Sequence, residues 1–263
     1  MSHHLAHVMA FSEVGPWQAY RRIARLIAEG YISEHVVSGL GVKALQLTKK
    51  GFSLIRYDLG DLKELRFNPQ SVTHDYWTTA FQLGPFVPDL SDKVSFVTEQ
   101  EVQAFDSGVL PSWLPQSREH IPDGFISLGG GNGQTHIALE VELNLKPPLR
   151  YDKVAYYFDV IDSPIALVFW LCGNFALAET IFQRLVRAKL RGLGVHHFFI
   201  LDEYRQLGWQ APARTGQFKN KTIQEILTAK QWQNAVKMTS KQWQKERAPI
   251  FFQTTKSPQN QMR

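Results

Sequence analysis

Apolar and acidic positions alternate through residues 137–143, where Glu140 and Glu142 stand between Leu139, Val141 and Leu143. A strand has a side-chain period of two, so this pattern predicts a strand with both glutamates on one face. Two carboxylates on an otherwise apolar strand are costly to bury without a counter-charge. We therefore expect this strand to carry chemistry as well as packing.

Helical periodicity opens the chain. Residues 18–32 place apolar side chains on one face and arginines largely on another, and Gly30 ends the predicted helix. Two short runs follow, at 35–37 and 43–47, and Thr48 is the expected N-cap of the next helix.

The rest of the chain alternates between predicted helices and strands, which indicates an α/β core. Thr98 and Glu101 have the spacing of a capping box at a helix start, and Pro147-Pro148 breaks the chain after the acidic strand. Helices are predicted over 72–83, 151–159 and 177–190, and strands over 164–171 and 195–201, whereas 86–96 is predicted to be a loop that leads into a strand.

The first 60 residues have a local resemblance. An arginine-rich helix over 21–32, a glycine-flanked hairpin and a Leu-Thr-Lys-Lys-Gly-Phe helix start at 47–52 together resemble a winged helix-turn-helix domain. In such domains the helix carries the recognition face and the hairpin is the wing. A dimerisation or docking role remains the alternative. The DNA-contacting residues expected here are Arg21, Arg22, Arg25, Lys43, Lys49 and Lys50.

Charge is concentrated near the C-terminus. The chain carries a net charge of +5, yet residues 210–263 alone hold ten Lys or Arg against two Glu. A basic block on a slightly acidic body indicates a polyanion partner, with a solvated helix face as the alternative. Trp232 and Trp243 stand among these lysines and suit base stacking, or a helix that docks on the same domain.

Composition favours a cytoplasmic protein. Hydrophobic residues make up 44% of the chain, enough for a packed core, yet no apolar run approaches the roughly 18 residues of a membrane span. Residues 1–11 lack the pattern of a signal peptide. The single cysteine, Cys172, excludes an intrachain disulfide and fits a reducing compartment.

Three acids form the candidate catalytic set. Asp123 follows Pro122, and after a glycine-rich turn Glu140 and Glu142 follow on the paired strand. Carboxylate oxygens suit a hard cation, so Asp123 and Glu140 are the expected ligands of Mg²⁺ or Mn²⁺. This layout resembles the PD-(D/E)xK nuclease core, with Glu142 where the motif has lysine. Glu142 would then orient or deprotonate the attacking water.

Nearby side chains could supply the missing positive charge. Lys146 joins the candidate catalytic set, and Arg150 and Lys153, one helical turn apart, are expected to contact DNA. A tyrosine nucleophile remains open, because Tyr151, Tyr156 and Tyr157 closely follow the acidic strand.

Other motifs favour structural roles. The glycine-rich run at 129–133 lacks the form of a nucleotide-binding loop and is predicted to be a hairpin turn. His196-His197 fits a buried structural pair, whereas His74 beside Asp75 could approach the acidic site from its helix. His3, His4 and His7 could bind a metal ion as a cluster, and the alternative is a frayed terminus.

A winged helix followed by Ile-Pro-Asp-Gly-x-Ile, then Ala-Leu-Glu-Val-Glu-Leu-x-x-Lys and Arg150-Tyr151, resembles the replication-relaxation family over roughly residues 19–201. Within that family the chain looks like the MobC-type relaxases of mobilisable plasmids. The resemblance implies a DNA-nicking protein that acts at an origin of transfer, with Asp123, Glu140 and Glu142 as the acidic set and Lys146 close by.

Together these observations predict an α/β (α+β) chain in three parts. They are a winged-helix DNA-binding domain (1–60), a restriction-endonuclease-like mixed-sheet domain (61–250) and a polar, disordered tail (251–263). The expected function is a metal-dependent nickase in plasmid mobilisation, with DNA and accessory mobilisation or coupling proteins as partners. A DNA-binding regulator of plasmid replication or transfer with an inactive nuclease core is the alternative, and a protein-docking module is a third possibility.

Overall fold

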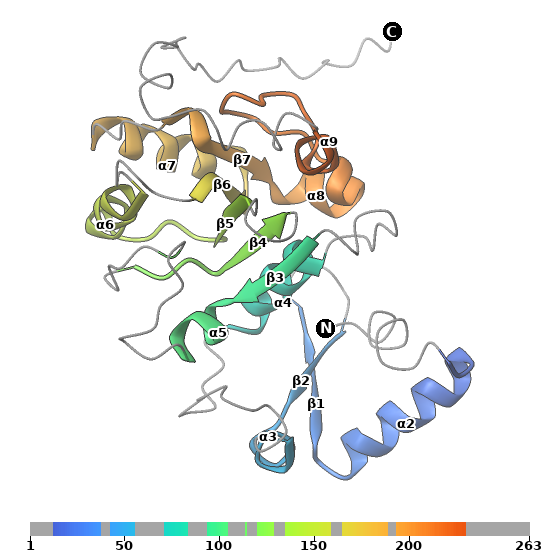
Figure 1. Cartoon of the computed structure of the whole chain (residues 1–263). Coiled ribbons are helices and arrows are strands. Elements are labelled where there is room, and N and C mark those ends of the chain that lie inside the picture. Colours follow the sequence, from blue (N-terminus) through green and yellow to red (C-terminus); the bar gives the residue numbers. More distant parts are fainter. Residues whose placement is uncertain are drawn as a thin grey trace, which may run out of the picture.

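The structure is a computed structural model of the whole chain (Figure 1). It describes residues 13–37, 43–55, 71–83, 94–104, 114, 120–128, 135–158, 165–188 and 193–229. All statements below concern these ranges. The described part contains a two-stranded sheet near the N-terminus and a five-stranded sheet that follows it. The expected mixture of helices and strands is confirmed.

The N-terminal elements are α2 (Pro16–Ala28), β1 (Ile32–Val36), β2 (Lys43–Leu47) and α3 (Lys49–Ile55). The predicted helix ends four residues before its expected limit, because Gly30 takes a φ of +75° and the chain turns into β1. Strands β1 and β2 pair antiparallel. The expected cap is confirmed, since the Thr48 hydroxyl accepts a hydrogen bond from Gly51 N at 3.1 Å.

Five strands form the main sheet in the order β3-β4-β5-β6-β7. Strands β3, β4 and β5 pair antiparallel, whereas β5, β6 and β7 run parallel. Parallel neighbours need crossovers, which α6 and α7 supply. The strands span Val94–Thr98 (β3), Gly124–Leu128 (β4), Thr135–Glu142 (β5), Ile165–Cys172 (β6) and His196–Ile200 (β7).

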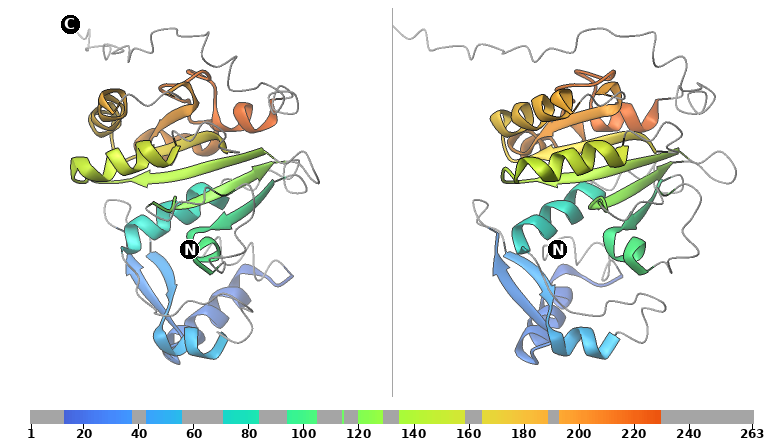
Figure 2. Two further views of the ribbon diagram at one scale, coloured as in Figure 1. Left: turned by 60° about the vertical axis from the view of Figure 1, so that its left-hand side comes forward. Right: turned by 90° about the vertical axis from the view of Figure 1, so that its left-hand side faces the viewer.

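Helices cover both faces of this sheet, as Figures 1 and 2 show. One face packs against α6 (Pro148–Phe158) and α7 (Phe175–Arg187). The other packs against α4 (Val72–Leu83), α8 (Leu201–Leu207) and α9 (Ile223–Thr228). Two short 3₁₀ turns (Leu193–Val195 and Gly208–Gln210) and the six-residue helix α5 (Glu99–Ala104) complete the described elements.

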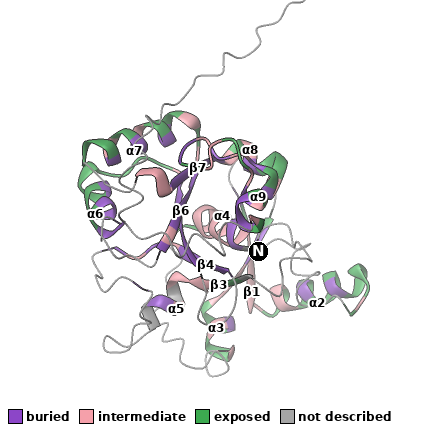
Figure 3. Cartoon of the chain, turned by 45° about the horizontal axis from the view of Figure 1, so that its top comes forward, coloured by how far each residue is buried: buried purple, intermediate pink, exposed green. Residues whose placement is uncertain are grey.

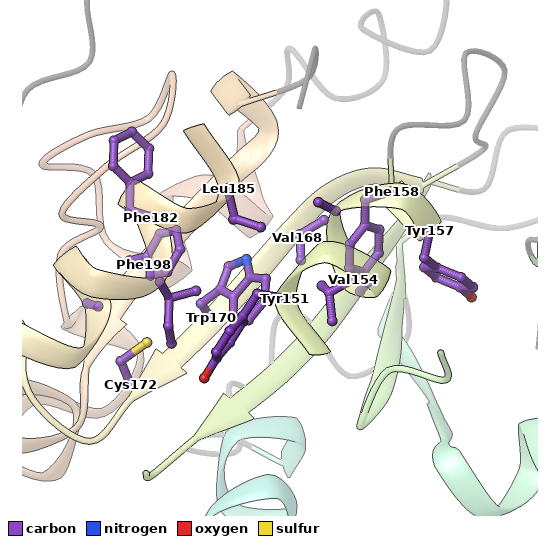
Figure 4. Packing of buried hydrophobic residues seen from close by; sticks show 14 of the residues in the cluster. Tyr151, Val154, Tyr157, Phe158, Val168, Trp170, Cys172, Phe182, Leu185 and Phe198 are labelled. Atoms are coloured by element: carbon purple, nitrogen blue, oxygen red, sulfur yellow. The ribbon is translucent and has the colours of Figure 1, made fainter. Parts of the chain in front are cut away.

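Strand β5 is buried along its whole length. Ile137, Leu139 and Val141 join the core beneath α4 and α8, whereas Ala138 joins the core beneath α6 and α7. By the period of two, Glu140 and Glu142 lie on the α6 side with Ala138, as the alternating pattern predicts. In that core Trp170 stacks on Phe198 with ring centroids 5.3 Å apart (Figure 4).

Local sequence signals account for several helix starts. Glu101 Oε2 accepts a hydrogen bond from Thr98 N at 2.6 Å, and Glu101 N donates to Thr98 Oγ1, which is the expected capping box. Helix α6 begins at Pro148 rather than after the expected break, because proline is tolerated at the first helical position. Cys172 is a buried free thiol at the end of β6.

None of the described helices is both long and apolar enough to cross a membrane.

Candidate functional site

Asp123 lies immediately before β4 and faces the C-terminal end of β5. Its Oδ2 accepts a hydrogen bond from Val141 N at 2.6 Å. Helix α4 carries His74 to the same place, with Nε2 3.4 Å from Asp123 Oδ2 and 3.1 Å from Val141 O. Two oxygens around one ring nitrogen call for an N–H, so Nε2 is the donor. The structure therefore places His74 beside Asp123, where the sequence analysis suggested that it could lie.

The charge state of His74 follows from its neighbours. Burial lowers the pKa of His74, but hydrogen bonds to Asp123 and Asp75, with their charges, outweigh it and raise the pKa to about 10. Its Nδ1 lies 3.6 Å from Asp75 Oδ1. His74 is thus an imidazolium at neutral pH, and it supplies a counter-charge to Asp123.

Glu140 points into the core beneath α6, where His120 meets it. His120 Nε2 lies 2.5 Å from Glu140 Oε1, and the glutamate side chain is only 1% exposed. Burial raises the pKa of Glu140 although His120 opposes the shift. Burial lowers the pKa of His120, but the charge of Glu140 reverses the effect and the net shift is upward. The pair therefore retains a proton more readily than either group does in water.

Glu142 ends β5 and is also 1% exposed. Its Oε1 lies 3.5 Å from Arg150 Nε on α6, whereas its Oε2 is buried without a hydrogen-bond partner. Burial raises the pKa of Glu142 to about 7, against the opposing charge of Arg150. The charge of Lys146 also lowers the pKa of Glu142, so this exposed lysine lies within electrostatic reach of the carboxylate.

Asp123, Glu140 and Glu142 therefore form one acidic cluster. Asp123 Oδ2 binds the backbone N of Val141, the residue between the two glutamates, and the charge of Asp123 adds to the upward shift in the pKa of both glutamates. Each acid has a nitrogen partner of the kind that its burial led us to expect. His74 pairs with Asp123, His120 with Glu140, and Arg150 with Glu142. His120 was missed by the sequence analysis, because nothing in the local pattern distinguishes it from any histidine before a strand.

The carboxylate chemistry suits a hard cation, and the buried, unpartnered Glu142 Oε2 is an oxygen that a cation or water could use. As the side chains lie, no group of three or more His, Cys, Asp or Glu in the described ranges is gathered tightly enough to hold a metal ion. The expected ligands Asp123 and Glu140 each use an oxygen to bind a protein group. Metal binding at this cluster therefore requires side chains to move.

The three tyrosines after β5 divide into two kinds. Tyr151 and Tyr157 are buried, and burial raises the pKa of both, that of Tyr151 to about 12. The Tyr151 hydroxyl accepts a hydrogen bond from Lys146 N at 3.0 Å, so this tyrosine fixes the chain before α6. Tyr156 is 69% exposed. A raised pKa disfavours the phenolate nucleophile at Tyr151 and Tyr157.

Several of the cations expected to contact DNA are partnered within the N-terminal elements. Arg25 forms an exposed ion pair with Glu29, and Lys43 forms one with Glu34. Lys50 donates to Glu29 O at 2.7 Å and lies 4.2 Å from the centroid of the Tyr31 ring. The other expected residues are also exposed, namely Arg21, Arg22, Lys49, Arg150 and Lys153, and of these Arg150 is paired with Glu142.

The pair His196 and His197 is buried and structural, as expected. His196 Nδ1 accepts a hydrogen bond from Trp170 Nε1 at 2.9 Å, and His197 Nε2 accepts one from Phe218 N at 3.2 Å. Burial lowers the pKa of His196 to about 3 and that of His197 to about 4.

Some expectations fall outside the described residues. They concern His3, His4, His7, the glycine-rich turn at 129–133, and the basic segment beyond residue 229 with Trp232 and Trp243.

Comparisons with known proteins add no relative. No family model matches the chain, and neither the curated proteins nor the solved structures contain a significant match.

Proposed function

We propose that the chain is a metal-dependent DNA endonuclease that nicks one strand. The observation that carries this proposal is the hydrogen bond from Val141 N to Asp123 Oδ2, which places Asp123, just before β4, at the end of β5 that carries Glu140 and Glu142. Gly124 pairs with Leu139, so the next antiparallel position sets Asp123 beside Glu140. A mixed sheet that carries its acids on an antiparallel hairpin supports the nuclease-like class expected from the sequence.

The acids have distinct proposed roles. Asp123 and Glu140 would hold Mg²⁺ or Mn²⁺, which when bound lowers the pKa of a water and neutralises charge on the phosphate. Glu142 offers the unpartnered Oε2 as acceptor for a proton of that water. Lys146 and Arg150 provide positive charge beside Glu142 in place of the usual lysine.

Substrate and partners come from the resemblance to the MobC-type relaxases. On that basis the proposed substrate is an origin of transfer, which the N-terminal arginine-rich helix α2 and the β1–β2 hairpin would locate as a winged helix. Arg21, Arg22 and Lys49 on exposed positions support this assignment, because phosphate contacts dominate affinity for duplex DNA. Accessory mobilisation or coupling proteins are the further partners of such a system.

The test is a nicking assay on supercoiled plasmid that carries the origin of the protein's own mobile element. With Mg²⁺ or Mn²⁺, the wild type should convert supercoiled to open-circular DNA. Glu140→Ala and Asp123→Asn should lower the rate by at least a hundredfold, as expected when a charge-stabilising group is lost. Glu179→Ala removes an exposed carboxylate on α7 and is the matched control. Equal nicking by wild type and Glu140→Ala would refute the proposal.

One observation favours the second candidate, a DNA-binding regulator with an inactive nuclease core. Each acid already has a cationic partner, and both glutamates are 1% exposed, as buried structural ion pairs would be. On this hypothesis the wild type binds duplex DNA yet gives no nicked product with any divalent metal. Arg21→Ala with Arg25→Ala should then weaken duplex binding and reduce its salt dependence.

A further inference from the structure

Helix α6 presents an exposed ridge of apolar, aromatic and basic side chains beside the acidic cluster. Leu149, Lys153 and Tyr156 are spaced as one stripe of the helix, and Arg150 flanks it. Leu149 is 67% and Tyr156 69% exposed, so neither contributes to the core. We call this surface, with Lys146 at its N-terminal end, the α6 ridge (Lys146, Leu149, Arg150, Lys153 and Tyr156). Figure 3 shows the exposed face of α6 turned away from the sheet.

The ridge is tied to the acidic cluster and to α7. Arg150 Nε lies 3.5 Å from Glu142 Oε1, so one edge of the ridge borders the cluster. At its N-terminal end, Lys146 N donates to Tyr151 Oη and Lys146 O accepts from Arg184 Nη1, both at 3.0 Å. The Arg184 guanidinium also lies 5.2 Å from the centroid of the Tyr151 ring. These contacts fix the backbone at Lys146 before any ligand binds, which lowers the entropic cost of ordering this end of the ridge.

Charge and exposed surface identify the chemistry of the occupant. Three cations, Lys146, Arg150 and Lys153, stand on the ridge against one exposed acid, Asp152, at its edge. A positive ridge attracts a polyanion. An exposed tyrosine and leucine among the cations suit unstacked bases, because every base has a face that an aromatic ring can cover. A duplex keeps its bases stacked inside and offers only phosphates to such a surface.

We infer that the α6 ridge binds single-stranded DNA, with Tyr156 stacking on a base and Lys153 on the phosphate backbone. This inference rests on the proposed function and deepens it, because it assigns the strand that enters the acidic cluster to an unpaired conformation. The strand would run along the exposed stripe and reach the cluster beside Arg150.

The experiment measures binding without cleavage. Full-length protein in EDTA is titrated into fluorescein-labelled oligo-dT of about 20 nucleotides, and separately into a duplex of equal length, and fluorescence anisotropy gives the Kd. Tyr156→Ala should weaken oligo-dT binding about tenfold and leave duplex binding within about twofold. Tyr156→Phe keeps the ring and should restore the wild-type Kd. Lys153→Ala should lower the slope of log Kd against log salt by about 0.7 on oligo-dT.

Leu207→Ala removes another exposed apolar side chain, on α8, and is the control for surface changes of similar size. The inference is overturned if Tyr156→Ala leaves oligo-dT binding unchanged, or if it weakens oligo-dT and duplex binding equally. The same experiments distinguish failure of this inference from failure of the proposed function.

If the wild type cuts no DNA but Tyr156→Ala still weakens oligo-dT binding, the ridge remains a single-strand site without a nuclease. A protein that nicks plasmid normally when Tyr156 is removed, and binds oligo-dT no more weakly, retains only the nuclease.

Discussion

Acidification should destabilise this protein through two buried histidines. His196 and His197 are 0% exposed, and both use a ring nitrogen as a hydrogen-bond acceptor, from Trp170 Nε1 and Phe218 N. An accepting nitrogen carries no proton, so both rings are neutral in the fold. Burial lowers the pKa of His196 to about 3, with the neighbouring His197 adding to the shift, and burial lowers the pKa of His197 to about 4.

The sign of the effect follows from linkage. The folded pKa of each histidine lies below its value of 6.5 in the unfolded chain, so the stabilisation is complete above pH 6.5 and is lost as the pH falls toward the folded values. At pH 5 the unfolded chain binds a proton at each site, which stabilises it by about 2 kcal/mol per histidine. Protonation of both histidines in the unfolded chain therefore lowers the free energy of unfolding by about 4 kcal/mol between pH 7 and pH 5. This is a large share of the roughly 5–15 kcal/mol by which a typical domain is stable.

Another histidine acts in the opposite direction. The pKa of His74 is raised to about 10, so its stabilisation is complete below pH 6.5 and is lost as the pH rises toward 10. The absolute stability of the wild type therefore sums opposing effects. The contribution of the buried pair has to be isolated by a difference between two proteins.

His196→Asn supplies that difference, because the Asn carbonyl can accept from Trp170 Nε1 and does not titrate. Urea denaturation at pH 7, 6 and 5 gives the free energy of unfolding of both proteins. The smaller side chain already lowers the stability of the variant at pH 7. The comparison is therefore between the two proteins' changes in the free energy of unfolding with pH, not between their absolute values. Wild type should lose about 2 kcal/mol more than the variant between pH 7 and 5. Parallel pH curves, or NMR titration of His196 near pH 6, would refute the reasoning.

Two further predictions concern stability alone. His120→Ala leaves Glu140 buried without its partner and should lower the free energy of unfolding, measured by urea denaturation, by about 3–5 kcal/mol. Adding Glu140→Gln to that variant should recover part of the lost stability. A double variant as unstable as the single one would contradict this. Gly216→Ala places a Cβ 2.6 Å from His197 Nε2 at a φ of +83°, so the melting temperature should fall by at least about 5 °C, and an unchanged value would exclude the close approach.

Local patterns predicted the parts of the fold whose causes are local. The alternation around Glu140 and Glu142 predicted β5 and the shared face of its acids, since strand geometry alone fixes that relation. Thr48 and Thr98 predicted helix starts because a cap needs only a hydroxyl and the next three residues. Pro148 was interpreted as a break, yet it opens α6, because proline suits both a break and a first helical position.

Contacts between distant segments were beyond the reach of these patterns. His120 meets Glu140 across 20 residues and His74 meets Asp123 across 49, and neither distance in sequence carries a periodic signal. Helices α8 and α9 were not predicted, because one is seven and the other six residues long and both join the same core cluster as α4, although Thr222 and Glu225 form a capping box that marks the start of α9.

The cationic partners change what the acidic cluster requires. Three carboxylates, Asp123, Glu140 and Glu142, are balanced by His74, His120 and Arg150, so their burial is compensated without any metal ion. A divalent ion would therefore enter a cluster in which each acid already has a nitrogen partner, and these partners would have to move to admit it. Only Glu142 Oε2 lacks a partner among the buried side-chain oxygens of the cluster. A nuclease would use that oxygen toward water and metal, whereas a regulator has no use for it. If the wild type nicks DNA, Glu142→Gln should abolish nicking and leave DNA binding unchanged, whereas nicking at the wild-type rate by this variant would exclude Oε2 from the reaction.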